Sequence, residues 1–286
     1  MLNEKDIVIS ASRKTDYPAF FLPQLKAVLA QGYFFSLNEY SKERKLIEIP
    51  KERVHSISLW SKNYDKFIQN PGILDDYNLY FQFTVTGYSN YIERNVPNYT
   101  ETVKQMELLA NKYGADKINW RFDPIGFFPK EAKTKGVQRL AQERLETFTA
   151  LCELISKTGV ERCTISFMDT KYFKVSNRLS NLGIEFYEPN DNEKYELLNR
   201  MVDIANANSI HIYSCASPLI ENVNGIKKSA CIDGNVLQKL FGGNVGTKKD
   251  VGQRPDCGCT KSIDLANYDM RCGNNCVYCY ANCAIK

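Results

Sequence analysis

Clustered cysteines are the most unusual chemical feature of this 286-residue chain. There are ten cysteines, and Cys272, Cys276 and Cys279 are spaced C-x3-C-x2-C within one short loop. Three thiolates so close in sequence can ligate three irons of a [4Fe–4S] cluster and leave the fourth iron open to another ligand. Zinc and a set of disulfides are the alternatives, although zinc prefers four protein ligands and no histidine lies nearby. The spacing therefore favours an iron–sulfur cluster with an open coordination site.

The other seven cysteines divide according to their expected surroundings. Cys152 falls in a helical pattern and Cys163 in an apolar strand run, so both are expected to be small buried side chains. Cys283 is interpreted as incidental, with a spare metal ligand as the alternative. The last four lie at a strand end or in irregular segments, and we predict a second metal centre held by Cys215, Cys231, Cys257 and Cys259. A closed [4Fe–4S] cluster is favoured there because the first site already implies cluster loading, with zinc or four free buried thiols as the alternatives.

Charged and hydrogen-bonding side chains follow nearly every apolar run of the sequence. If those runs are the strands of a barrel, the side chains meet at the carboxyl ends, where barrel enzymes carry their active sites. We therefore predict a polar ring in which the catalytic candidates are Arg13, Asp16, Lys62, Arg121, Asp123 and Asp169. The cofactor-binding candidates of the ring are Ser12 and Asn63. For any single member a helix cap or a loop contact is an equal alternative, as at Asp16, which precedes Pro18 by two residues.

Two further pairs of residues carry groups that could do chemistry. Arg121 and Asp123 stand two positions apart, so in an extended strand they point to the same side. They are expected to form a structural ion pair or to hold a charged ligand such as an amino-acid moiety. His55 and His211 are the only histidines, and both lie within apolar runs, so they are interpreted as core residues.

The elements that must position these residues alternate along the chain. Apolar or β-branched runs predict strands at Asp6–Ser10, Tyr33–Ser36, His55–Trp60, Leu79–Thr84, Lys117–Phe122, Arg162–Phe167, Gly183–Tyr187 and Ser209–Ser214. Helical spacing predicts helices at Pro18–Ala30, Ser61–Gln69, Tyr99–Tyr113, Val137–Lys157, Asn192–Ala207 and Gly234–Phe241. This alternation predicts an α/β fold, a (β/α) barrel that is complete or irregular, over residues 1–215, with an open doubly wound sheet as the alternative. Residues 216–286 are too few for a core of their own, so we expect a cysteine-rich extension that a metal centre docks over the strand ends.

The three-cysteine loop resembles the signature of radical S-adenosylmethionine (SAM) enzymes in its C-x3-C-x2-C spacing and in Tyr278 before the third cysteine. Within that superfamily, the stretch Cys276–Ala281 is similar to the corresponding stretch of spore photoproduct lyases. The resemblance implies that the open iron chelates the methionine moiety of SAM and that reduction yields a 5′-deoxyadenosyl radical. It also implies that Tyr278 lies against the adenine and that an external donor such as flavodoxin or ferredoxin supplies the electron.

The position of the loop near the C-terminus resembles one uncharacterised family of about this length, whereas the superfamily carries its motif after the first strand. The likeness runs along nearly the whole chain, with landmarks at Ser10–Asp16, Leu59–Asn63, Trp120–Ile125, Cys231–Asp233, Gln253-Arg254, Cys257–Cys259 and Cys276–Asn282. This family has no agreed reaction, so the resemblance implies cofactors and a fold but no substrate.

The composition of the chain argues against two classes of protein, nucleic-acid scaffolds and membrane proteins. Thirty-seven basic and thirty-three acidic side chains give a formal net charge of +4, which argues against a strongly cationic nucleic-acid scaffold. The sequence lacks an apolar run of about 20 residues and a signal-peptide pattern at its start, so a soluble, cytoplasmic protein with no membrane partner is expected. The leading hypothesis is a radical SAM enzyme acting on a small molecule or a modified residue. A nucleic-acid repair or modification lyase and a non-catalytic iron–sulfur or zinc protein are the alternatives.

Overall fold

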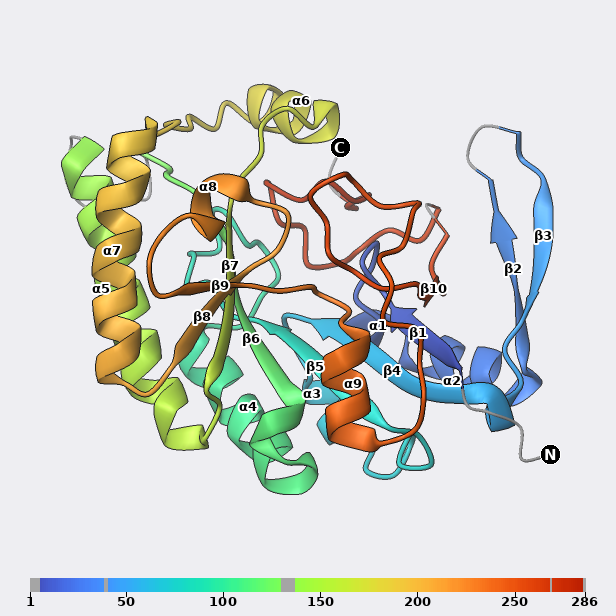
Figure 1. Cartoon of the computed structure of the whole chain (residues 1–286). Coiled ribbons are helices and arrows are strands. Elements are labelled where there is room, and N and C mark those ends of the chain that lie inside the picture. The colour runs from blue at the N-terminus through green and yellow to red at the C-terminus, as the bar shows by residue number, and fades with distance from the viewer. Residues whose placement is uncertain (1–5, 39–40, 130–136, 268, 285–286) are drawn as a thin grey trace.

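Eight parallel strands form the central sheet of the protein (Figure 1). The structure is a computed structural model that describes residues 6–38, 41–129, 137–267 and 269–284. Every neighbouring pair within the sheet is parallel, and the strands stand in the order β10, β1, β4, β5, β6, β7, β8, β9. Their bounds are β1 Ile7–Ala11, β4 Val54–Ser61, β5 Leu79–Thr84, β6 Ile118–Ile125, β7 Arg162–Phe167, β8 His211–Ser214, β9 Ile226–Lys228 and β10 Ile263–Asp264.

The sheet is open, so the prediction of a (β/α) barrel is wrong. Its two edge strands, β9 and β10, are not paired with each other in the described part of the chain. Residues Tyr33–Ser36, expected as a barrel strand, belong to β2 (Tyr33–Leu37), which forms a separate antiparallel hairpin with β3 (Arg44–Glu48). The side chains of Tyr33 and Phe35 are exposed there, whereas a barrel strand would bury both of its faces. Residues Gly183–Tyr187 form no strand and contribute one isolated bridge, between Phe127 and Tyr187.

The longer helices at residues 22–31, 99–113, 137–155 and 191–207 pack on one face of the sheet. Alternate strand residues such as Ile9, Phe81 and Ile165 share the main buried core with Leu25 and Phe148 from two of these helices. The strands from β1 to β8 follow chain order without a reversal, so the sheet is also not doubly wound. The helix bounds are α1 Tyr17–Phe20, α2 Leu22–Gln31, α3 Asp65–Ile68, α4 Tyr99–Tyr113, α5 Val137–Ile155, α6 Phe173–Asn181, α7 Asp191–Ala207, α8 Pro218–Glu221 and α9 Gly234–Phe241. Among the described residues, no helix is both long enough and apolar enough to cross a membrane.

The opposite face of the sheet is polar and is covered by the last part of the chain. Gln82, Asn119 and Thr164 are buried on this face and are joined by hydrogen bonds of 2.7 Å and 2.9 Å through the Asn119 amide. Helix α9 lies in front of the sheet in Figure 1, and its Leu237 packs against Tyr80 of β5 in a small apolar cluster. The chain from β9 to β10 therefore occupies the side of the sheet that a closed barrel would enclose.

Candidate functional site

The loop that carries Cys272, Cys276 and Cys279 lies at the carboxyl ends of the central strands. It runs antiparallel to the segment that follows β5, and the two are joined by backbone hydrogen bonds. Asn95 N–H donates to the Asn274 carbonyl at 3.1 Å, and Val277 N–H donates to the Ile92 carbonyl at 3.0 Å. Cys276 itself forms an isolated bridge with Glu93. The loop is thus fixed against the same edge of the sheet from which the strand-end side chains project.

A buried arginine holds the other side of the three-cysteine loop. Arg178 of α6 donates through Nη1 to the carbonyls of Cys279 at 2.5 Å and Val277 at 3.3 Å, and through Nη2 to that of Ala281 at 3.3 Å. A guanidinium suits this task because it presents several N–H donors in one rigid plane. Arg178 was missed by sequence reasoning, although its position beside Leu179 on the apolar face of a short helix is a readable signal.

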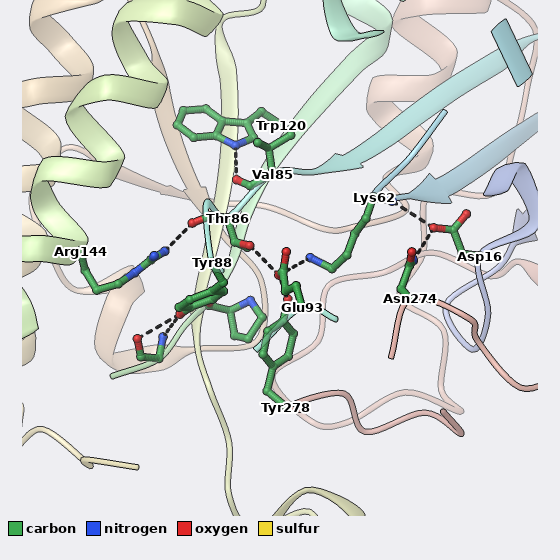
Figure 2. Close-up of polar contacts among 12 residues, drawn as sticks. Asp16, Lys62, Val85, Thr86, Tyr88, Glu93, Trp120, Arg144, Asn274 and Tyr278 are labelled. Atoms are coloured by element: carbon green, nitrogen blue, oxygen red, sulfur yellow. Dashed lines mark hydrogen bonds and ion pairs between the residues drawn. The ribbon is translucent and has the colours of Figure 1, made fainter. Parts of the chain in front are cut away.

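Glu93 is the centre of a buried hydrogen-bond network at this edge (Figure 2). Its Oε1 accepts from Thr86 Oγ1 at 2.6 Å and from the Tyr278 hydroxyl, and it pairs with Lys62 Nζ at 2.8 Å. The Lys62 ammonium also lies 5.5 Å from the centroid of the Tyr278 ring. Burial alone lowers the pKa of Lys62, but the Glu93 carboxylate and the Cys276 thiol more than offset this, and the pKa is raised. Lys62 is therefore a permanent positive charge beside the cysteine loop.

Asp16 joins three segments at the same edge. Its Oδ1 accepts from Ala19 N–H at 3.0 Å, so it caps α1, and the cap interpretation of this residue is confirmed. Its Oδ2 accepts from the backbone N–H of Lys62 at 3.0 Å and from Asn274 Nδ2 at 2.7 Å. Burial raises the pKa of the Asp16 carboxyl. The residue thus ties the loop after β1, the loop after β4 and the cysteine loop together (Figure 2).

The donor set of this site fits a polyatomic cluster better than a single ion. Within the described residues, the thiols of Cys272, Cys276 and Cys279 do not form a group whose sulfurs all lie within 4.8 Å of one another. Cys283 touches Cys279, and a hydrogen bond from its thiol lowers the pKa of Cys279 to about 7. Three buried polar atoms from the first loop and the cysteine loop have no hydrogen-bond partner among the described residues: Arg13 Nε, Thr15 Oγ1 and Asn274 Oδ1. Because buried polar atoms are nearly always bonded, this set fits a polar cofactor at the loop.

A second group of cysteines converges on the polar face of the sheet. The sulfurs of Cys215, Cys257 and Cys259 all lie within 4.8 Å of one another. The Cys231 thiol is outside this close group but lies beside Cys215 and Cys259, and its proximity lowers the pKa of Cys215 to about 6. Arg121 Nη1 donates to Cys231 Sγ at 3.2 Å. The structure therefore groups three of the four cysteines of the predicted second centre, Cys215, Cys257 and Cys259, and places Cys231 beside two of them.

The predicted polar ring is divided among several places. Arg121 and Asp123 form an ion pair beside the second cysteine group, and Asp123 also accepts from Ser166 Oγ. Asp16 and Lys62 lie at the three-cysteine loop, as described above. The other members make local contacts: Ser12 and Arg13 bond to Asp264 of β10, Asn63 bonds to Gln105 of α4, and the exposed Asp169 accepts from the N–H of Lys171.

A cavity of about 300 Å³ lies beside Tyr88, between the loops after β5 and β6 and helix α5. The Tyr88 ring is 5.7 Å from the ring of Tyr278, so one aromatic side chain separates the cavity from the network of Glu93. The Arg144 guanidinium lies 4.0 Å from the centroid of the Tyr88 ring, and Arg139, Glu143 and Glu146 complete the charged lining. Such a lining suits a small polar molecule. Sequence reasoning missed this cavity because its charged residues lie on helix α5 and only the fold brings that helix against the ends of β5 and β6.

Comparison with known proteins gives a family but no activity. A family model described as a domain of unknown function, DUF1848, matches residues 8–281, which include both cysteine groups. Comparison with curated proteins finds no match.

Proposed function

The chain belongs to the DUF1848 family, and on that premise we propose that it is a radical SAM enzyme acting on a small molecule or a modified residue. The observation that carries the proposal is the position of the three-cysteine loop. It lies at the carboxyl ends of parallel strands, where α/β enzymes bind their ligands, and not on a distant surface. The C-x3-C-x2-C spacing with Tyr278 supplies the resemblance to radical SAM enzymes.

Cys272, Cys276 and Cys279 would hold a [4Fe–4S] cluster, which in its bound state supplies the electron that cleaves SAM to a 5′-deoxyadenosyl radical. Arg178 fixes the carbonyls of this loop, so the three thiols keep one arrangement. Burial raises the pKa of the Cys276 thiol, and the adjacent Lys62 ammonium offsets part of this rise in favour of a thiolate ligand.

Glu93 orients the two groups that would meet the cofactor. It accepts from Lys62 and from Tyr278, which fixes the ammonium and the phenol at the same time. Tyr88 and Arg144 then close the wall between this network and the polar cavity of about 300 Å³. A radical formed among buried side chains is shielded from water, which would otherwise quench it.

The cavity and the mild charge support a small substrate over nucleic acid. A cavity of about 300 Å³ accommodates a metabolite-sized molecule, and a net charge of +4 provides little attraction for a phosphate backbone. A flavodoxin or a ferredoxin is the proposed electron donor.

The test is anaerobic reconstitution with iron and sulfide, followed by incubation with SAM and dithionite. We expect 5′-deoxyadenosine from the unmodified chain and none from a variant with alanine at Cys272, Cys276 and Cys279. Cys152→Ala is the matched control because Cys152 is fully buried in the main core, away from both cysteine groups. Unchanged 5′-deoxyadenosine formation in the triple variant would refute the proposal.

A further inference from the structure

We propose that Cys215, Cys231, Cys257 and Cys259 bind one tetrahedral metal ion, with zinc as the expected occupant, and not a second iron–sulfur cluster. The site is separate from the three-cysteine loop and does not depend on the proposed SAM chemistry. The four cysteines come from three separate stretches of chain. Cys215 follows β8, Cys231 follows β9, and Cys257 and Cys259 lie in the segment that precedes β10. None is in a disulfide, and the last two are almost completely buried.

The separation of the sulfurs decides between an ion and a cluster. Zinc–sulfur bonds of about 2.3 Å in a tetrahedron place neighbouring sulfurs about 3.8 Å apart. In a cubane each cysteine binds a different iron at a corner, so the cysteine sulfurs must lie roughly 6 Å apart. The sulfurs of Cys215, Cys257 and Cys259 all lie within 4.8 Å of one another, which is the spacing of ligands to a single ion and is closer than a cubane requires. Cys231 is outside this close group but lies beside Cys215 and Cys259, so it is the fourth ligand of the proposed site.

The surroundings of the four thiols complete a site of this kind. Arg121 Nη1 donates to Cys231 Sγ at 3.2 Å, and its Nη2 is held by Asp123. Metal sites usually have hydrogen-bond donors that orient the ligand atoms and are themselves held in place by a carboxylate. Arg121, held by Asp123, is such a donor to the Cys231 sulfur. The Arg121 guanidinium offsets part of the negative charge of a tetrathiolate site. Four protein ligands leave no position open for a substrate.

The ion would fasten the polar face of the sheet to the chain that covers it. Residues 242–262 contain no helix or strand, and their backbone contacts are few. A four-thiolate ion links this segment to the ends of β8 and β9, and its binding free energy becomes folding free energy for the segment.

The experiment uses the full chain with alanine at Cys272, Cys276 and Cys279, so that only the second group can bind metal. The metal-free protein is titrated anaerobically with Co²⁺, whose thiolate charge-transfer and visible bands report tetrahedral sulfur ligation, and is then titrated with zinc. We expect one Co²⁺ per chain with the bands of four thiolates, displaced by one equivalent of zinc, and loss of these bands when Cys257 and Cys259 are also replaced.

A conservative variant covers the case in which that last protein does not fold. Cys215→His keeps four ligands, and we expect one Co²⁺ per chain with a thiolate charge-transfer absorbance lower by about a quarter. An unchanged spectrum in Cys215→His would overturn the assignment of this ligand. Binding of about four irons and four sulfides per chain at the second group, or no stoichiometric Co²⁺ binding, would overturn the proposal. Neither result depends on SAM cleavage.

Discussion

Neutralising Glu93 should destabilise the protein far more than neutralising an equally close but exposed carboxylate. The side chains of Lys62 and Glu93 are only 12% and 4% exposed, and their charged atoms are 2.8 Å apart. In Glu93→Gln the Lys62 ammonium stays buried without its counter-charge. Removing one partner of a buried ion pair costs about 3–5 kcal/mol, so we expect a loss of this size in the free energy of unfolding. Replacing Lys62 with Met in the same chain removes the stranded charge and should restore most of the loss.

The assay is urea denaturation of metal-free protein under anaerobic conditions, followed by circular dichroism. Asp76→Asn is the matched control, because Asp76 pairs with Lys51 at 2.6 Å while both side chains stay more than half exposed. We expect no measurable loss in this control, since water screens the pair. A loss in Glu93→Gln no larger than that of Asp76→Asn would refute the account of the network.

The same pair predicts the sign of a pH dependence. The folded pKa of Lys62 is raised above its ordinary value of 10.5. A raised pKa of a basic group means that its contribution to stability is fully present below the unfolded pKa and is lost as the pH rises through the folded value. The stability difference between the unmodified chain and Lys62→Met should therefore be constant from pH 7 to about pH 10 and should shrink above it. A difference that changes near neutral pH would contradict this.

Three further changes have definite expected outcomes. Arg178→Met removes three hydrogen bonds to the carbonyls of the cysteine loop, so the iron bound after reconstitution should fall, whereas Arg200→Met on the exposed face of α7 should leave it unchanged. Tyr278→Phe removes one donor from Glu93 and should lower the free energy of unfolding by about 1 kcal/mol with the fold retained, measured by urea denaturation. Asn98→Ala removes the side-chain cap of α4 and should cost about 1 kcal/mol, visible as a lower Tm without loss of bound iron.

Local signals predicted the elements whose ends are fixed by nearby residues. Helix α4 begins at Tyr99 because Asn98 accepts from the N–H of Glu101, and its predicted bounds are confirmed. Helix α9 is also confirmed, and there Asp233 caps the first turn. The prediction of a barrel was wrong because closure of a barrel depends on whether the first and last strands of the sheet pair with each other. The run at Tyr33–Ser36 has the composition of a strand, but only its pairing with β3 shows that it lies outside the sheet.

The cysteine groups of the candidate site could be predicted from the sequence because several cysteines had to be assigned together. A single polar residue whose partners are far away in the sequence could not be predicted in this way. Cys215 and Cys257 are 42 positions apart, but both lack a place in a helix or a strand interior, and elimination grouped them. Glu93 lies in a loop between Ile92 and Arg94 with no strand-end signal. Its importance arises only when Lys62 and Tyr278, 216 positions apart, fold against it.

The pairing of β1 with β10 can form only late in the synthesis of this protein, because the two strands are far apart in the sequence. Ser10 bonds to Asp264 across a separation of 254 residues, and Leu265 N–H donates to the Ser10 carbonyl at 3.0 Å. At about 5–20 residues per second, the ribosome needs roughly 13 to 50 s to supply this partner after the first strand emerges. During that interval the edge of β1 is unpaired and the inner face of the sheet is open to water. That face carries Gln82, Asn119 and Thr164 beside the apolar side chains of Val8 and Tyr80, so the unfinished sheet exposes both polar and apolar groups. Because an unpaired strand edge can pair with another chain, the late arrival of β10 and of Leu237 in α9 sets how long the nascent protein is open to such pairing.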